Sequence, residues 1–99
     1  MTAEGDALRR SFDTAVASGT VFLTPMGPLI LAAAGLELAL DSRSFARRFG
    51  VAHALVIREC TSLSDDLGLI KTECRGGRSQ RLFYRLTSAG EHSLGLKGR

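Results

Sequence analysis

The stretch from Asp41 to Gly90 constrains the fold more than any other part of this 99-residue chain. Its apolar spacing is helical up to Leu67, and two short strand patterns then flank the pair Gly76-Gly77. Glycines tolerate the positive φ angles that tight hairpin turns need. The order helix, turn, helix, hairpin, helix predicts a mainly α-helical domain with one small β-hairpin.

The same periodicities divide the whole chain into elements. Apolar spacing predicts helices over residues 3–18, 25–40, 43–49 and 52–67, a connector or strand over 21–23, strands over 69–75 and 78–86, and a short helix after Thr87. Thr24, Asp41 and Thr87 are expected to cap the helices that follow them, and Gly50 to form the turn between two helices. The inward residues of the fourth helix are predicted as Val56, Cys60, Leu63 and Leu67.

Residues 20–40 have the length of a membrane span and carry one charge, Glu37. Two prolines and two glycines interrupt the segment, and a glutamate inside the bilayer is costly. We expect instead a buried soluble helix that is apolar on most sides. With a polar, acidic N-terminus and no secretory signal pattern, the sequence favours a cytoplasmic protein.

The charge of the chain is unevenly distributed. Residues 1–40 have a net charge of −2, whereas residues 41–86 hold nine Lys and Arg against five acidic residues, a net charge of +4. The positive charge therefore coincides with the predicted helix pair and hairpin. This pattern favours a polyanionic partner, and a solvated basic face is the alternative.

Three segments together resemble the winged helix-turn-helix regulators, especially those of the MarR type. They are Phe45-Ala46-Arg47-Arg48-Phe49-Gly50-Val51, then Leu67-Gly68-Leu69-Ile70, and then Arg85-Leu86-Thr87-Ser88-Ala89-Gly90. The resemblance implies a three-helix core with a wing, here preceded by an added N-terminal helix. It implies a winged helix domain over residues 20–95. We expect residues 1–19 to form a separate dimerisation helix and residues 96–99 a flexible tail.

The resemblance also implies that the protein binds double-stranded DNA as a homodimer and regulates transcription, most simply as a repressor. Such a protein is expected to be associated with the nucleoid. By position, the base-facing residues of the recognition helix are Ala52, His53, Ala54, Leu55 and Arg58. The helix before it would contact the DNA backbone through Ser42, Arg43, Ser44, Arg47 and Arg48. The wing would contact DNA through Arg75, Arg78, Ser79, Gln80 and Arg81.

This chain departs from the family pattern in three places. Ala52 stands where a Ser or Thr cap is usual, and the interval from Gly50 to Gly68 is about one residue longer. The chain also ends soon after Leu94, without the long C-terminal helices that dimerise MarR proteins. We therefore expect the dimer interface on the N-terminal helix, formed by Leu8, Phe12, Ala15 and Val16.

The polar residues give no sign of enzyme chemistry. Two histidines and two cysteines show no metal-ligand spacing, and the sequence contains neither a nucleophile with a paired base nor a phosphate-binding glycine loop. We expect no cofactor, no metal and free thiols, with Cys60 in the core and Cys74 on a strand.

Two alternatives stay open at this point. Arg58 could pair with a neighbouring acid rather than with a guanine. Leu55 and Ile57 are unusual on a DNA-facing helix, and they suit a winged helix used only for protein–protein assembly. A DNA-binding protein should respond steeply to salt, and an assembly module should not.

Overall fold

The computed structural model describes residues 3–74 and 81–96. The elements are α1 (Ala3–Ala17), α2 (Met26–Gly35), α3 (Ser42–Phe49), α4 (His53–Thr61), a π-helical turn η1 (Ser62–Asp66), β1 (Ile70–Cys74), β2 (Leu82–Leu86) and α5 (Ser88–Ser93). Strands β1 and β2 pair antiparallel. The predicted mainly α-helical fold with one β-hairpin is confirmed.

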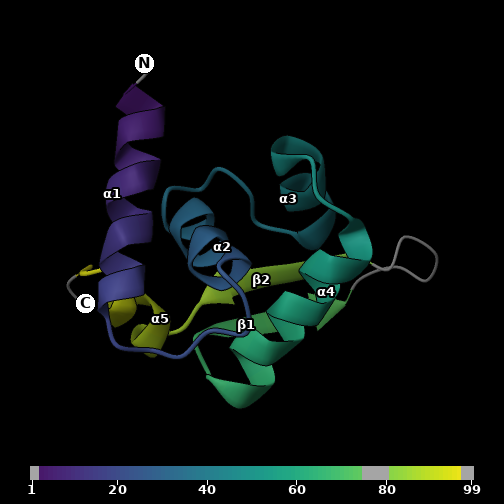
Figure 1. Ribbon diagram of the computed structural model, residues 1–99. Helices are drawn as coiled ribbons and strands as arrows, with labels where there is room; N and C mark the ends of the chain where they lie inside the picture. The colour runs from purple at the N-terminus through teal and green to yellow at the C-terminus, as the bar shows by residue number, and fades with distance from the viewer. Residues whose placement is uncertain (1–2, 75–80, 97–99) are drawn as a thin grey trace.

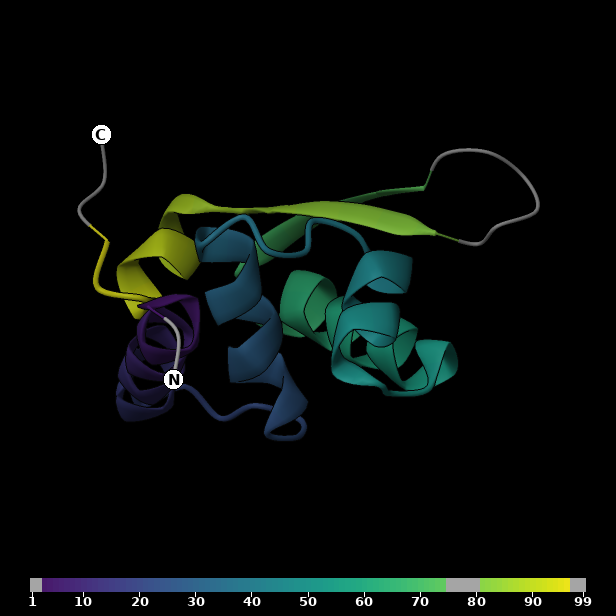
Figure 2. The ribbon, with the colours of Figure 1, turned by 90° about the horizontal axis from the view of Figure 1, so that it is seen from above.

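The hairpin lies along one side of the helices (Figures 1 and 2). Helices α1 and α5 lie at one end of the molecule, and α3 and α4 lie at the other, near the far end of the hairpin. Helix α2 lies between them and contacts α1, α4 and β2. This central position explains why its sequence is apolar on nearly every side, because each side packs against another element.

Helix α2 is shorter than predicted. It ends at Gly35 rather than at Leu40, because Glu37 adopts a left-handed conformation with φ 59°. The amide of Leu38 then donates to the carbonyl of Ala33 at 2.8 Å, which closes the helix end. Residues 36–40 leave the helix, and Leu40 is exposed instead of buried. Within the described residues, every helix is too short or too polar to span a lipid bilayer.

The predicted caps and the predicted glycine turn are present. Asp41 Oδ2 accepts a hydrogen bond from the Ser44 amide, and Thr87 Oγ1 accepts one from the Gly90 amide. The hydroxyl of Thr24 accepts one from the Met26 amide at the start of α2. Gly50 has φ 67°, so the turn between α3 and α4 uses the left-handed conformation that glycine adopts without strain.

The helix predicted over residues 52–67 is α-helical only as far as Thr61. The next turn, η1, is π-helical, and such a turn contains an additional residue. It lies inside the interval between Gly50 and Gly68 that is longer than in the family pattern. The wider turn keeps Val56, Cys60 and Leu63 buried, with Leu67 half-buried. The predicted inward face is thus retained despite the extra length.

Leu69 and Arg81 lie outside β1 and β2, although the sequence predicted them in strands, and residues 21–23 form no strand. Residues 75–80 of the predicted strands and turn are outside the described residues. In the hairpin, Thr72 pairs with Tyr84 and Ile70 with Leu86, so these side chains share the face toward the helices. Tyr84 is buried there, while Leu82 and Leu86 are half-buried. On the opposite face, Arg85 is exposed and Phe83 is half-buried.

Candidate functional site

The segment just before α3 holds the hairpin against the helices. The Leu40 carbonyl accepts a hydrogen bond from the Tyr84 amide at 3.1 Å, and Asp41 forms a β-bridge with Phe83. The guanidinium Nε of Arg81 lies 3.3 Å from Asp41 Oδ2. Leu40 and Asp41, the two residues before α3, therefore pair with β2 through an isolated β-bridge.

Ser42 connects three elements through one hydroxyl group. The Leu82 amide donates to Ser42 Oγ at 2.9 Å, and Oγ lies 2.8 Å from Nε2 of His53, the first residue of α4. The side chain is fully buried. The prediction that Ser42 contacts a DNA phosphate is therefore wrong. Its position at the meeting of α3, α4 and β2 leaves its hydroxyl no access to a ligand.

The hydrogen bonds of Ser42 favour a neutral His53. Because Oγ already accepts from Leu82, its own proton is free to be donated to an unprotonated Nε2. Burial lowers the pKa of His53 below its ordinary value, and the nearby Arg43 lowers it further, while Asp41 acts in the opposite direction. An imidazolium would have to donate to Oγ and would displace the serine proton from its acceptor.

This arrangement predicts that the fold loses stability in mild acid. A lowered pKa means that the unfolded chain binds the proton more readily, so stability is lost as the pH falls below about 6.5. We expect a smaller free energy of unfolding at pH 5.5 than at pH 7.5, measured by urea titration. The His53→Asn variant should reduce this difference, and the His92→Gln variant, which changes the exposed histidine of α5, should keep it. An unchanged pH dependence in His53→Asn would contradict the assignment.

The exposed side of α4 is narrower than predicted. Ala54, Arg58 and Thr61 are exposed and spaced by four and three residues, so they form one row along the helix. Leu55 is also exposed but lies about 100° around the helix axis from Ala54, on the flank toward α2. Ala52, exposed just before the helix, provides no side-chain cap, and His53 is half-buried against Ser42.

The basic residues of α3 differ in their surroundings. Arg47 is exposed at the surface, and Arg43 is half-buried. Arg48 forms an ion pair with Glu4 of α1 at 2.6 Å, and Ser44 hydrogen-bonds to Asp41 through its hydroxyl. Both side chains thus have partners within the chain. Four residues predicted for the wing lie outside the described residues, namely Arg75, Arg78, Ser79 and Gln80.

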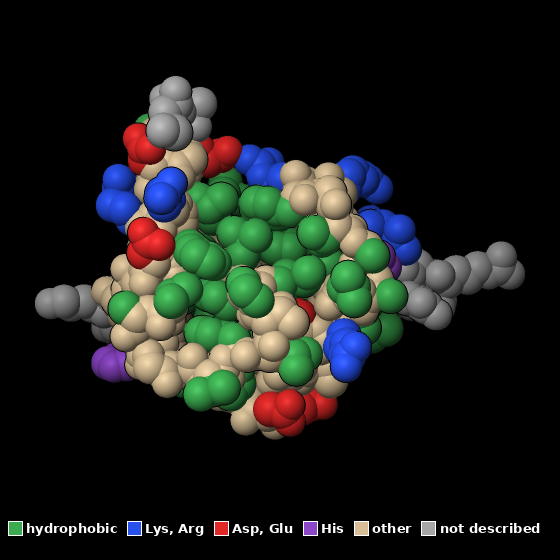
Figure 3. Space-filling model, viewed as in Figure 1, with side chains coloured by type: hydrophobic (Ala, Val, Ile, Leu, Met, Phe, Trp, Pro, Cys, Tyr) green, Lys and Arg blue, Asp and Glu red, His purple; other side chains and the backbone are tan. Residues whose placement is uncertain are grey.

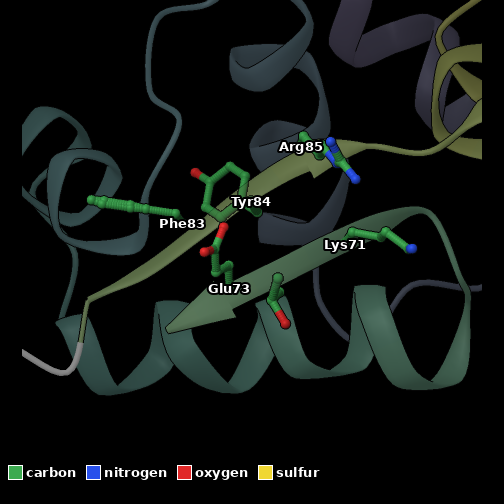
Figure 4. Close-up of a pocket in the computed structure, with 6 residues that line it drawn as sticks. Lys71, Glu73, Phe83, Tyr84 and Arg85 are labelled. Carbon is green, nitrogen blue, oxygen red and sulfur yellow. The ribbon is translucent and has the colours of Figure 1, made fainter. Parts of the chain in front are cut away.

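The hairpin carries a hollow of about 410 Å³ among residues of both strands. Figure 4 shows Lys71 and Arg85 at one end of this hollow and Phe83 at the other. Lys71 and Arg85 are directly paired across the strands, and two like charges in this position repel each other. These two side chains raise the positive potential of the hairpin on the face that points away from the helices.

Sequence reasoning missed the role of Glu59. Its side chain is only 2% exposed, and its two oxygens accept hydrogen bonds from the amide and the hydroxyl of Thr24 at 3.2 and 2.7 Å. The carboxylate thereby fixes α4 to the start of α2 and is hidden from the surface. The signal was its spacing, because Glu59 follows the inward Val56 by three residues and precedes the inward Leu63 by four.

The predicted dimer face on α1 is only partly available. Ala15 is fully buried against its own chain, so its assignment to a dimer interface is wrong. It faces the body of the molecule, where small side chains allow close helix packing. Leu8 and Phe12 are half-buried, and Val16 is half-exposed at 52%.

The cysteines lie in contrasting surroundings. Burial raises the pKa of the Cys60 thiol to about 12, so this thiol is protonated and unreactive, whereas Cys74 is exposed at the end of β1. Within residues 3–74 and 81–96, no group of three or more His, Cys, Asp or Glu side chains could hold a metal ion.

Comparison with known proteins identifies no relative. No protein-family model matches the chain, and neither a curated protein nor a solved structure matches it.

Proposed function

We propose that this protein is a winged helix-turn-helix regulator that binds double-stranded DNA. In this reading α2, α3 and α4 are the three-helix core, α4 is the recognition helix, and the β1–β2 hairpin is the wing. The observation that carries the proposal is the exposed row Ala54, Arg58 and Thr61 on α4, next to a hairpin that Asp41 and Ser42 hold in place. An exposed helix beside an anchored hairpin suits a major groove and its flanking backbone.

The distribution of charge supports this reading. The carboxylate of Glu59 is buried and hydrogen-bonded to Thr24, so its oxygens are turned away from the surface that carries the arginines near α4. Arg58 has no charged partner among the described residues, so its guanidinium is available for a guanine edge. Asp65 and Asp66 are exposed beyond Thr61, which restricts a DNA contact to the N-terminal part of the helix. Recognition helices contact base edges through that part.

Regulation by a homodimer remains part of the proposal. Two-fold symmetry would double the contact area and set half-sites about one helical turn apart. The exposed residues of α1 are one candidate for this contact. Occlusion of a promoter by the bound dimer would make the protein a repressor.

A second candidate function is an assembly module that binds another protein and not DNA. The observation that favours it is the exposed Leu55, which adjoins a hollow of about 200 Å³ that Leu23 and Met26 also line. An apolar side chain on this flank contributes nothing to phosphate binding. The two candidates differ in whether Arg58 distinguishes one duplex sequence from another.

The test begins with preferred sites selected from a random pool of duplexes. Arg58→Ala is expected to weaken binding to a selected site by roughly 5- to 150-fold, the effect of removing one bidentate interaction with a base, and to weaken random duplex much less. Arg78→Ala should weaken both kinds of duplex, because a wing arginine contacts the backbone or minor groove.

Lys71→Ala is the matched control for this test. It removes the same charge from the outer face of the hairpin and should change neither affinity strongly. Fluorescence anisotropy with labelled duplexes measures all three variants. Equal losses on selected and random duplex for Arg58→Ala would remove its assigned role, and failure to select any site would favour the assembly module.

A further inference from the structure

The face of the molecule opposite the hairpin carries an apolar surface that its own chain leaves uncovered. Figure 3 shows hydrophobic side chains gathered between α1 and α4 on this face. Three hollows of about 450, 450 and 200 Å³ follow one another across it. The first two share Phe12, and the last two share Leu23 and Thr24. We call this continuous surface the apolar trough, lined by Leu8, Phe12, Val16, Leu23, Met26 and Leu55.

The trough is unusually exposed for a monomer of this size. Val16, Leu23 and Leu55 are 52%, 49% and 51% exposed. Contiguous exposed apolar patches on a soluble protein mark interaction sites.

The two rims of the trough carry opposite charges. Asp6, Arg9 and Asp13 form the rim on α1, with two acidic groups to one basic group. Arg58 is the exposed charge of the rim on α4. Glu59 lines the same hollow but is 2% exposed and bonded to Thr24, and the exposed Asp65 and Asp66 follow in η1. A two-fold rotation about an axis through the middle of the trough exchanges its ends. It places the acidic rim of one copy against the basic rim of the other.

We propose that the occupant of the trough is the trough of a second copy of this chain. Apolar side chains of α1, α2 and α4 then bury one another, and Asp6 or Asp13 of each copy faces Arg58 of the other. This inference deepens the homodimer proposed above and rests on it, because it extends the interface beyond α1 to Leu23 of the connector and Leu55 of α4. It also explains the apolar flank of α4, since Leu55 contacts the second copy while Ala54 and Thr61 stay free.

In this dimer, Arg58 lies between the surface that contacts DNA and the surface that contacts the second copy. Its guanidinium has five N–H donors, of which a guanine edge takes two. A carboxylate of the second copy would accept from the remaining donors and orient the side chain. Dimer formation and base recognition would then be coupled through this one residue.

The test measures dimerisation of the full chain without DNA, so its result is independent of whether the protein binds DNA. Sedimentation equilibrium of the wild-type protein should give a dimer. The double variant Val16→Glu/Leu23→Glu should raise the dimer dissociation constant by at least about 100-fold, since it buries two unpaired carboxylates. Leu40→Glu is the matched control, because Leu40 is 47% exposed but lies outside the trough. It should leave the dimer intact.

Charge reversal tests the pairing of the rims. Arg58→Asp should weaken the dimer, Asp6→Arg/Asp13→Arg should also weaken it, and the combined triple variant should regain most of the wild-type dissociation constant. Absence of this recovery would overturn the rim pairing. A wild-type protein that stays monomeric at about 100 µM, where a dimer with a dissociation constant of about 1 µM would be mostly assembled, would overturn the proposal. A dimer that Val16→Glu/Leu23→Glu leaves unchanged would also overturn it.

Circular dichroism shows whether the variants fold. If they do not, a second measurement on the wild-type protein tests the same interface. In a concentration series of the ¹⁵N-labelled wild-type protein, the amide signals of Phe12, Leu23 and Leu55 should shift with dimerisation, and that of Leu40 should not. Shifts confined to other elements would place the interface elsewhere and contradict the trough assignment.

Discussion

Raising the salt concentration from 50 to 200 mM is expected to weaken binding to duplex DNA by about 10²- to 10⁴-fold, the range for roughly 4–8 phosphates neutralised per dimer. The reason is the net charge of +4 in residues 41–86. Each phosphate contact releases counterions, so the logarithm of the association constant falls linearly with the logarithm of salt. Anisotropy titrations at four or more salt concentrations measure the slope.

Variants that each remove one basic side chain show which part of the surface binds the phosphates, because each lost contact reduces the slope. Arg47→Ala and Arg78→Ala should each reduce it by about two units, the effect of removing one phosphate-binding cation from each copy of the dimer. Arg48→Ala should reduce it less, because Arg48 is paired with Glu4 and contributes little free charge. A flat response of the wild-type protein over the same range would exclude the DNA-binding reading and leave the assembly module.

Replacing Gly90 by alanine is expected to destabilise the fold by about 3 kcal/mol or more, because a close-packed backbone cannot move away. A Cβ at this position would overlap the carbonyl oxygen of Leu69 and lie 3.1 Å from its carbonyl carbon. The same oxygen accepts the Thr87 amide at 3.0 Å, so it is fixed where α5 meets the base of the hairpin. For a domain of this size such a loss lowers the Tm by more than about 12 °C.

Gly35→Ala provides the comparison for this effect. Its Cβ would lie 2.8 Å from Leu94 Cδ1, the end of a flexible side chain that can rotate away. We expect it to cost less than about 1 kcal/mol, partly offset by the better helix propensity of alanine. Thermal melts followed by circular dichroism distinguish the two variants. A similar Tm for both would show that α5 can shift relative to Leu69.

Local features of the fold could be read from the sequence because each depends on residues a few positions apart. Asp41 and Thr87 cap the following helices through side-chain bonds to amides three residues later, and Gly50 meets the local need for a positive φ. The pairing of Thr72 with Tyr84 agrees with the alternation of the two strand patterns. Apolar periodicity likewise placed Val56, Cys60 and Leu63 in the core.

Apolar periodicity does not predict where α2 ends or that α4 continues into a π-helical turn. Residues 36–40 continue an apolar helical pattern, yet Glu37 takes the left-handed conformation and releases the chain toward β2. In η1 the helix widens to a π-helical turn, and Leu63 stays buried. A regular α-helix, as the periodicity predicts, would contain no such turn. Both choices serve packing against other elements.

The candidate site itself depended on tertiary structure, because its polar residues find partners far along the chain. Ser42 has the sequence position of a surface residue at a helix start, but its hydroxyl bonds to Leu82, forty residues away, and to His53. Glu59 bonds to Thr24, thirty-five residues away, which no local pattern indicates. Sequence pattern therefore determined which elements form, through local hydrogen bonds and the burial of apolar faces. Only the packed chain decided which polar groups are enclosed, because a buried polar group is stable only where folding brings it a partner.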